Sequence, residues 1–430
     1  MFYFREEDSE SIVMVRYKRF MFSIIYTQGQ GSIMNSPEDN SQFERQRPVY
    51  LERNFQIICA VVLIAVIGVS SVTPAFPKLA KDLNINPKNL GLLITVFTLP
   101  SLILGPIIGV LADRWGRKII IVPSLFLFGI AGTACAFARD FNLLLWLRLL
   151  QGIGAASLLS LSITLIGDFY TGDRRSTAMG YNASISSVGT SSYPIIGGAL
   201  ATMGWYYPFM LPILAIPLGF LVLFALKNPE PKGERNLKEY LSNAVKVLKN
   251  RRLFGLFIAS AANFVFLYGA YVTYLPQLIN DTFKAPSTII GLLLSSVSIA
   301  ITITASQLGR LARRFPATNL ISASYIFYAL AMLIVPSVSN IWLLLIPSTI
   351  FGIGLGIGFP SIQTLLADLA PREYLATIIS VNGTFFGLGQ TLGPLLMGYA
   401  FGFGGISSVF YAATGFAVLI FFVFRYCTCM

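Results

Sequence analysis

The chain has 430 residues, of which 55% are hydrophobic and only 12% are charged, and its mean hydropathy is +0.70. Soluble domains carry about 25% charged residues, so this composition excludes a soluble globular enzyme. The sequence contains no histidine, which excludes Ser-His-Asp and Cys-His nucleophiles, His-ligated metal sites and a histidine proton relay. Apolar stretches of about 20 residues, long enough to cross a bilayer, recur along the chain. We therefore expect a multi-pass membrane protein.

The net charge of +12 comes from 31 Lys and Arg against 19 Asp and Glu. A nucleic-acid-binding surface needs clustered basic residues on a soluble domain, whereas these are mostly scattered in short loops between apolar stretches. We therefore predict the lipid bilayer as a partner, and no nucleic acid. The four cysteines have no metal-ligand spacing between pairs, so we expect neither a metal site nor a disulfide framework.

Residues 1–50 are polar, and their one apolar patch, at 21–26, is too short to span a membrane. We predict a disordered cytoplasmic tail there, with Met34 as an alternative start. Twelve apolar segments follow. Their expected bounds are 54–76, 90–111, 119–138, 142–167, 176–200, 205–226, 253–275, 288–308, 318–338, 341–366, 376–400 and 406–426.

A charged break at 227–252 holds eight Lys and Arg and separates six spans from six. It predicts a linker between an N-terminal half, 51–226, and a C-terminal half, 253–430. With an even number of spans both termini lie on one side, and the opposite loops hold only five basic residues. Because cytoplasmic loops carry the excess of Lys and Arg, we predict that both termini and the linker are cytoplasmic, in a cell-membrane protein.

The two halves repeat each other at an offset of 200 residues. Gly91-Leu-Leu recurs at Gly291, and Asp168 recurs at Asp368. Further pairs at the same offset are Gly152 with Gly352, Asn182 with Asn382, Gly189 with Gly389, Pro194 with Pro394 and Gly198 with Gly398. Such a repeat predicts an all-α membrane protein of twelve helices in two pseudo-symmetric six-helix halves.

A charged loop joins the second and third spans. Its residues are Gly109-Val-Leu-Ala-Asp113-Arg114-Trp-Gly116-Arg117-Lys118. Glycine at Gly116 permits a tight reversal, and the Asp113 carboxylate is suited to a helix N-terminus. The loop resembles the signature G-x-L-A-D-R-x-G-R-K of the major facilitator superfamily at every defined position. The resemblance covers about 54–426 and is nearest to the twelve-span drug:proton antiporters, which include multidrug and siderophore exporters.

The resemblance implies a conformational lock on the cytoplasmic side. Asp113 would contact the start of the eleventh helix near Ala376, and Arg117 would pair with Asp168. These contacts would hold in the outward-open state and break when the protein opens inward. The residues alone leave a second interpretation open, a basic loop that only anchors the topology. In the second half Arg313 replaces the acid and Pro316 replaces the glycine, so the lock is asymmetric.

Arg148, Gln151 and Gly152 resemble the R-x-x-Q-G motif of the family's fourth helix. Arg148 is the only ionisable residue that we place inside a span, where a lone charge costs several kcal/mol. The resemblance implies proton coupling or the organisation of a polar network, and the alternative is a side chain that snorkels to the surface. None of the 19 acids falls in a span. Coupling would therefore use Asp113, Asp168 or the network around Arg148.

The fifth span resembles the glycine-proline motif of family members that export their substrates. The residues that match are Gly180, Gly189, Pro194, Gly197 and Gly198. Tyr193 stands where the family has a further glycine. The second half repeats the pattern, so these small residues also fit a role in close helix packing alone.

The substrate cavity is expected near the membrane midplane between the halves. Candidate contacts are Gln151, Asn182, Asn263, Tyr268, Tyr271, Asn382, Phe386 and Gln390. Phe264, Tyr268 and Tyr271 share one helix face at i, i+4 and i+7. This stripe indicates either helix packing or an aromatic wall for bulky, neutral solutes.

The resemblance implies a secondary active transporter and not an enzyme. It implies proton-coupled efflux of lipophilic drugs or small metabolites by alternating access, by a monomer that needs no cofactor and is driven by the proton gradient. Its partners would be a small-molecule substrate and the proton. The alternatives are a dedicated exporter of one metabolite, such as a siderophore, and a non-transporting membrane receptor.

Overall fold

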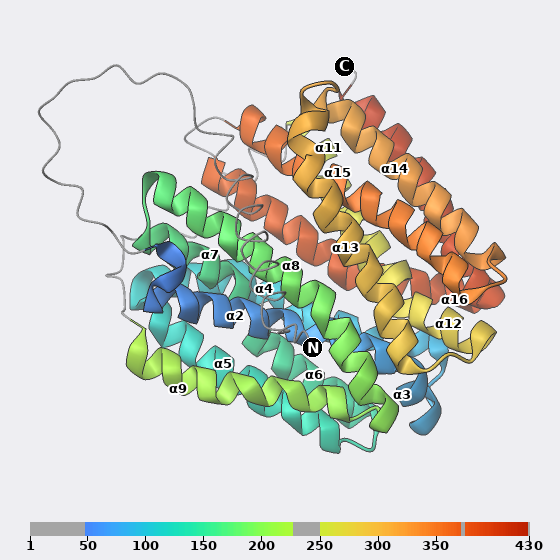
Figure 1. Ribbon diagram of the computed structural model, residues 1–430, viewed down its shortest axis with the longest axis horizontal. Helices are drawn as coiled ribbons and strands as arrows, with labels where there is room; N and C mark the ends of the chain where they lie inside the picture. The colour runs from blue at the N-terminus through green and yellow to red at the C-terminus, as the bar shows by residue number, and fades with distance from the viewer. Residues whose placement is uncertain (1–47, 227–249, 371–374, 429–430) are drawn as a thin grey trace, which may run out of the picture. The chain divides into compact units, whose positions relative to one another are not determined.

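A computed structural model of the protein describes residues 48–226, 250–370 and 375–428, and leaves out the side chains of Pro106, Val110, Asp113 and residues 375–377. The expected N-terminal tail, except its last three residues, and nearly all of the expected linker lie outside the described residues. Helices account for almost the whole described part, and no strand occurs in it (Figure 1).

The first half is built from eight α-helices joined by turns and short 3-10 segments. They are α2 (Arg53–Ser70), α3 (Phe76–Asp82), α4 (Leu92–Trp115), α5 (Arg117–Ala134), α6 (Phe141–Ala155), α7 (Leu158–Phe169), α8 (Gly172–Met203) and α9 (Ala215–Ala225). Local sequence sets several of these ends. Asp140 caps α6 by accepting a hydrogen bond from the Leu143 N–H at 2.9 Å. Gly116 joins α4 to α5 with φ +95°, a conformation that favours glycine.

In the described part of the second half, 250–370 and 375–428, there are six α-helices and one π-helical segment. They are α11 (Arg251–Phe264), η6 (Val265–Tyr274, π-helical), α12 (Leu275–Phe283), α13 (Ser287–Ala312), α14 (Ala317–Ile334), α15 (Leu345–Leu369) and α16 (Leu375–Thr428). α16 comprises two helices that meet at a kink, where Gly404 and Gly405 leave helical geometry. The buried apolar side chains form two cores, one within residues 49–226 and the other within 253–424.

Ten helical segments of the described part are long and apolar enough to cross a membrane. α8 is not among them despite its 32 residues, because serine, threonine and glycine make it too polar. The last of the ten, Ile378–Thr428, contains the two helices of α16. The count of twelve spans therefore stays a prediction.

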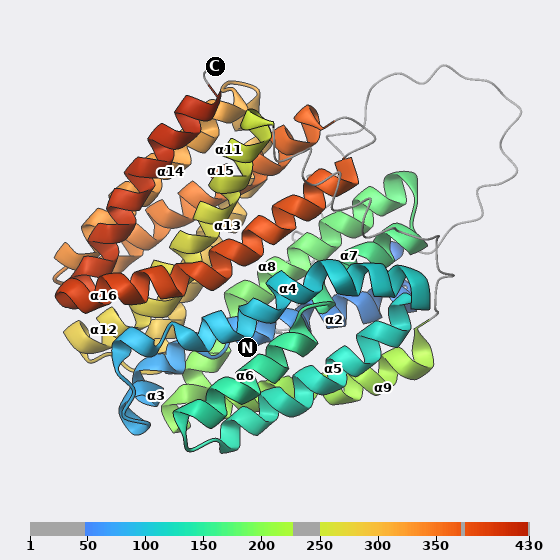
Figure 2. The same ribbon diagram turned by 180° about the vertical axis from the view of Figure 1, so that it is seen from behind.

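The two halves meet along two helix pairs, α8 with α13 and α4 with α16 (Figures 1 and 2). At one end of these pairs the backbones touch. A Cβ on Gly91 would lie 2.7 Å from the Pro394 carbonyl oxygen, and a Cβ on Gly291 would collide with the Pro194 carbonyl. The Tyr274 hydroxyl also donates to the Lys88 carbonyl at 3.2 Å. We call this the closed end.

The same four helices are apart at their other ends. Gly109 on α4, Gly180 on α8, Gly309 on α13 and Gly383 on α16 have no atom within 4 Å of the position that a Cβ would take. These glycines lie at the end of the bundle that carries the charged loop at Gly116. We call it the open end.

Replacement of Gly197 by alanine is expected to destabilise the protein by about 1–3 kcal/mol, since the new methyl group would run into the Ser71 carbonyl of α2. A backbone carbonyl in a packed helix pair cannot swing aside as a flexible side chain can. The matched control is Gly180→Ala on the same helix, where the space is empty. Thermal unfolding in detergent measures both variants, and equal midpoints would contradict this packing.

Candidate functional site

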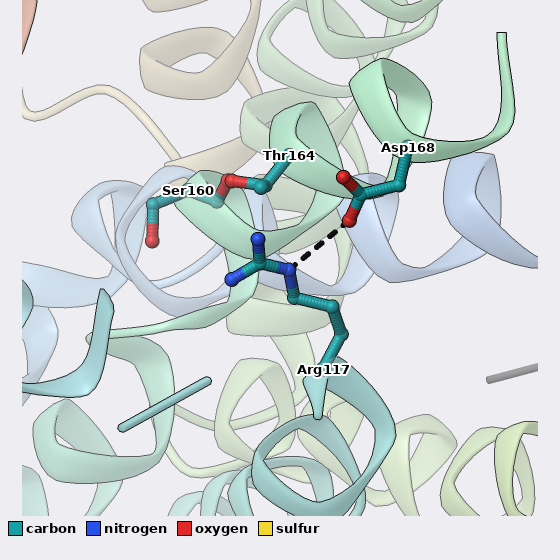
Figure 3. A network of polar contacts seen from close by, with 4 residues as sticks. All are labelled: Arg117, Ser160, Thr164 and Asp168. Atoms are coloured by element: carbon teal, nitrogen blue, oxygen red, sulfur yellow. Dashed lines mark hydrogen bonds and ion pairs between the residues drawn. The ribbon is translucent and has the colours of Figure 1, made fainter. Parts of the chain in front are cut away.

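An ion pair joins the two charged residues that the loop motif brings together. Arg117, at the start of α5, donates from Nε to Oδ2 of Asp168 near the end of α7 at 3.2 Å. Figure 3 shows Arg117 reaching toward the face of α7 that carries Ser160, Thr164 and Asp168. Both side chains of the pair are largely buried, with 9% and 13% of their surface exposed. The pair therefore fixes α5 against α7, and it is intact although this end of the bundle is open. The expectation that this contact breaks on opening is wrong, because both residues belong to the first half and do not bridge the halves.

The other residues of the loop are placed around this pair. Lys118 donates to the Leu226 carbonyl at 3.1 Å and ties α5 to the end of α9. Arg114 is exposed. The side chain of Asp113 and the region of Ala376 lie outside the described side chains, so the expected contact between them stays a prediction.

A second charged cluster at the open end was missed by the sequence analysis. Glu52, directly before α2, accepts hydrogen bonds from the Tyr170 hydroxyl at 2.8 Å and from the Arg174 guanidinium. Burial raises the pKa of Tyr170, and the hydrogen bond to Glu52 raises it further. The cluster connects the start of α2 to the turn between α7 and α8. The position of Glu52 two residues before the first expected span, 54–76, was the only signal in the sequence.

Arg148 is completely buried between three helices. Its Nη1 donates to the carbonyl of Gly68 on α2 and to Oε1 of Gln151, both at 2.8 Å. Its Nε donates to the carbonyl of Leu93 on α4 at 3.2 Å, and its guanidinium carbon lies 4.4 Å from the centre of the Phe97 ring. The side chain therefore does not snorkel to the surface. Within the described residues no carboxylate pairs with it.

The polar network around Arg148 is incomplete. Arg148 Nη2 and Gln151 Nε2 are buried and have no hydrogen-bond partner among the described residues. Next to them Gly152 packs against the carbonyl of Phe97, so α6 and α4 approach closely. Arg148 is thus held largely by backbone carbonyls, and two donors of the network remain unused. Such unused donors would let the Arg148 guanidinium change its hydrogen-bond partners.

The glycine-proline motif of α8 lies in helix contacts. Gly197 packs on the Ser71 carbonyl of α2, and Gly198 packs on the Ser287 carbonyl of the other half. Pro194 offers its carbonyl to Gly291, while Gly189 touches Leu63 and Tyr193. The packing interpretation therefore accounts for four of the five motif residues, and Gly180 alone faces open space. A link to export stays a prediction.

Three asparagines among the cavity candidates are buried with unused hydrogen-bonding groups. Asn263 on α11 is 1% exposed, and neither its Oδ1 nor its Nδ2 has a partner in the described part of the chain. Asn182 and its repeat mate Asn382 each have an unpartnered Oδ1, although Asn382 donates to Gln363 Oε1 at 3.0 Å. A buried amide without partners costs about 1–3 kcal/mol.

An aromatic cluster of the second half begins at Phe264, the residue that follows Asn263 in the chain. The Phe264 ring centre is 4.8 Å from that of Phe386 and 6.1 Å from that of Tyr268. Phe359 on α15 completes the cluster, 5.3 Å from Phe386. Tyr268 also packs against the core of the first half. Gln390, one turn beyond Phe386, is half-buried.

Tyr271 does not belong to this cluster, so the prediction that it shares a helix face with Phe264 and Tyr268 is wrong. It is 2% exposed in the core of the second half, stacks on Phe351 at 5.0 Å, and donates to Ser348 Oγ at 2.7 Å. The reason is the π-helical segment η6, in which hydrogen bonds run from i to i+5. The wider turn rotates Tyr271 away from the face of Phe264 and Tyr268.

A row of small hydroxyl residues on α8 was also missed. It comprises Ser184, Ser186, Ser187, Thr190, Ser191 and Ser192. Several bind backbone carbonyls of their own helix, such as Ser191 to Ser187 at 2.7 Å. These residues make α8 more polar than the other long helices. That low hydropathy was the signal in the sequence.

The chain belongs to the Major Facilitator Superfamily, whose sequence profile matches residues 58–284 and 266–428. It is 27% identical over 360 residues to the bacillibactin exporter of Bacillus subtilis, and this alignment covers 80% of this chain and 88% of the relative. It is 26% identical over 356 residues to multidrug resistance protein 2 of the same organism, with shares of 81% and 88%. It is 25% identical over 348 residues to the quinolone resistance protein NorA of Staphylococcus aureus, with shares of 79% and 88%.

Solved structures show the same fold. A bacterial homologue of the human lysosomal transporter Spinster, in an inward-facing and unoccupied conformation, superposes with a TM-score of 0.75 at 16% identity, over 87% of this chain and 96% of that one. The nucleoside transporter NupG superposes with a TM-score of 0.74 at 14% identity, over 87% and 99%.

These findings confirm the class of protein. The chain is an all-α secondary active transporter of the major facilitator fold, a multi-pass membrane protein that resides in a lipid bilayer and moves a small molecule. Its family is not a class of enzymes.

Replacement of Arg148 by lysine is expected to destabilise the protein, although the charge is kept. One ammonium group cannot reach acceptors on α2, α4 and α6 together, and each lost hydrogen bond to a charged donor costs about 1.5–3 kcal/mol. Thermal unfolding in detergent measures the effect, with the exposed Arg252→Lys as the control. An unchanged midpoint for Arg148→Lys would refute the network.

Proposed function

We propose that this transporter exports lipophilic drugs or small metabolites from the cell in exchange for protons. The observation that carries the substrate class is the aromatic cluster of Phe264, Tyr268, Phe359 and Phe386, together with the unpartnered amide of the preceding residue, Asn263. Aromatic faces bind flat apolar molecules, and one amide supplies both a donor and an acceptor that orient them. Drug-resistance proteins among the relatives support the same class.

The proposed direction, export, is compatible with the orientation that the charges at the open end predict. The open end carries the basic residues Arg114, Lys118, Arg313 and Arg314. By the positive-inside rule this end faces the cytoplasm, and both termini lie there. The state described here is then open to the cytoplasm, where an exporter collects its substrate. The protein resides in the cell membrane and acts as a monomer.

Proton coupling is proposed to act through carboxylates at the open end. Asp113 lies in the loop, and Asp168 holds Arg117. Protonation of Asp168 would remove the charge that binds Arg117 and release α5 from α7. Arg148 would transmit the change, since it ties α2, α4 and α6 together. No cofactor is needed in this scheme, and the proton gradient drives it.

One observation favours a second function, the dedicated export of a single metabolite. One relative, the bacillibactin exporter of Bacillus subtilis, is named for the export of a single metabolite. The incomplete hydrogen bonding of Asn182, Asn263 and Asn382 would suit a polar metabolite as well as a drug.

Dye efflux from cells that carry this protein tests the proposal. Efflux is expected in the wild type, and a protonophore is expected to stop it. Asp113→Asn and Arg148→Ala should each abolish coupled efflux, while Asp368→Asn, an exposed acid at the same end, should leave it intact. Full activity in both variants would contradict proton coupling through these residues. No efflux of any dye by the wild type would favour the dedicated exporter.

The aromatic cluster has its own test. Phe386→Ala is expected to raise the KM for an aromatic dye about 3- to 10-fold, because ring contacts are worth about 0.5–1.5 kcal/mol beyond the area that they bury. The control is the neighbouring Phe385→Ala, whose ring stacks on Phe257 at 5.2 Å instead. An equal KM in both variants would remove the cluster from the binding site.

A further inference from the structure

α8 and α13 run antiparallel across the contact between the halves, and their register can be followed residue by residue. Gly198 packs on the Ser287 carbonyl, and Gly291 packs on the Pro194 carbonyl. Further along, Ser298 Oγ donates to the Thr190 carbonyl at 3.3 Å. Each step toward the start of α8 is therefore matched by a step toward the end of α13.

The same register brings two opposite charges to one level at the open end. Asp173 lies 21 residues before Pro194, and Arg313 lies 22 residues after Gly291. At about 1.5 Å per residue, each lies roughly 30 Å along its helix from the contact between Pro194 and Gly291. Both side chains are exposed in this open state, and neither forms an ion pair with another described residue.

We propose that Asp173 and Arg313 form an ion pair between the halves when the open end closes. The pair would be a second lock, built with charges reversed relative to the loop at Asp113. The inference rests on the alternating access of the proposed function, because it concerns the state that follows the one described here.

The charges around the two residues explain why the pair is needed. Closure brings Arg310, Arg313 and Arg314 toward the N-terminus of α8, which is the positive end of that helix. The start of α8 also carries Arg174 and Arg175. Without an acid there, these like charges would oppose closure.

Three of the four other arginines around the pair have another contact. Glu52 holds Arg174, Arg175 packs over Gly167, and Arg310 donates to Gln307 at 2.7 Å. Asp173 is the acid in the first turn of α8. It is therefore the group at this helix start that can receive an arginine from α13.

The repeat explains the reversal of charge. The position of Asp113 in the first half is occupied by Arg313 in the second. An acid can rest on a bare helix N-terminus, but an arginine is repelled by it. A loop that ends in arginine therefore requires an acid in the first turn of the facing helix, and Asp173 supplies it.

Disulfide cross-linking in membranes tests whether the two positions meet. Asp173→Cys and Arg313→Cys are combined in a chain whose four native cysteines are replaced by serine, under conditions of active transport. We expect the pair to cross-link, since a disulfide requires Cα atoms within about 7 Å. Thr190→Cys with Ser298→Cys, which touch already in the open state, is the positive control. If the control pair cross-links in a transporting protein and 173 with 313 does not, the proposal is wrong.

Charge exchange tests whether the pair matters for transport. Asp173→Arg and Arg313→Asp should each reduce efflux at least about fivefold, and the double variant should recover most of it, as expected for residues in direct contact. Asp368→Arg, a charge reversal at the same end, should retain efflux. Full efflux in the single variants, or no recovery in the double variant, would overturn the proposal. If the proposed function were wrong, the wild type would show no efflux. The cross-link between positions 173 and 313 could still be measured in that case, so the two failures are distinguishable.

Discussion

The structure depends on the close approach of two backbones at the closed end. Gly91 meets the Pro394 carbonyl, and its repeat mate Gly291 meets the Pro194 carbonyl. A side chain at either glycine would separate the halves, because the obstacle is backbone and not a movable side chain. The contact is made twice, once by α4 with α16 and once by α8 with α13. These repeat-related contacts hold the halves together at this end in the state described here.

The two halves share a fold but differ in the charges at the open end. The first half is fastened internally, by Arg117 with Asp168 and by Glu52 with Tyr170 and Arg174. At the position that mirrors Arg117 the second half has Ala317, and its Asp368 is exposed. The first half can therefore move as one rigid unit, whereas the end of α13 carries exposed arginines without such internal ion pairs among the described residues. Such an asymmetry gives the open and closed states different electrostatic energies, which a proton or a substrate can then shift.

Much of the architecture could be predicted from the sequence, because it depends on patterns that a single chain displays. The 200-residue repeat gave the two halves, and the loop at Asp113 gave the family and the pairing of Arg117 with Asp168. The contacts of Arg148 could not be foreseen, since its acceptors are the backbone carbonyls of Gly68 and Leu93, and every residue has such a carbonyl.

Other features depend on three-dimensional geometry that no pattern in the sequence indicates. Tyr271 was expected beside Tyr268, but the π-helical turn of η6 changes the residues that share a face. Glu52 was not among the predicted site residues, and its contact with Tyr170 spans 118 positions in the chain. The low hydropathy of α8, by contrast, is readable in the sequence, although the row of hydroxyl groups that causes it was not predicted.

The central claim is that the two halves rock against each other, so that one end opens as the other closes. Two pairs of spin labels on the protein in lipid nanodiscs test it most directly. One pair, at Gly180 and Gly309, reports on the open end, and the other, at Lys88 and Gly402, reports on the closed end. On addition of substrate or a change of pH, the account predicts that a shorter 180–309 distance accompanies a longer 88–402 distance. A change at one end with no change at the other would contradict it.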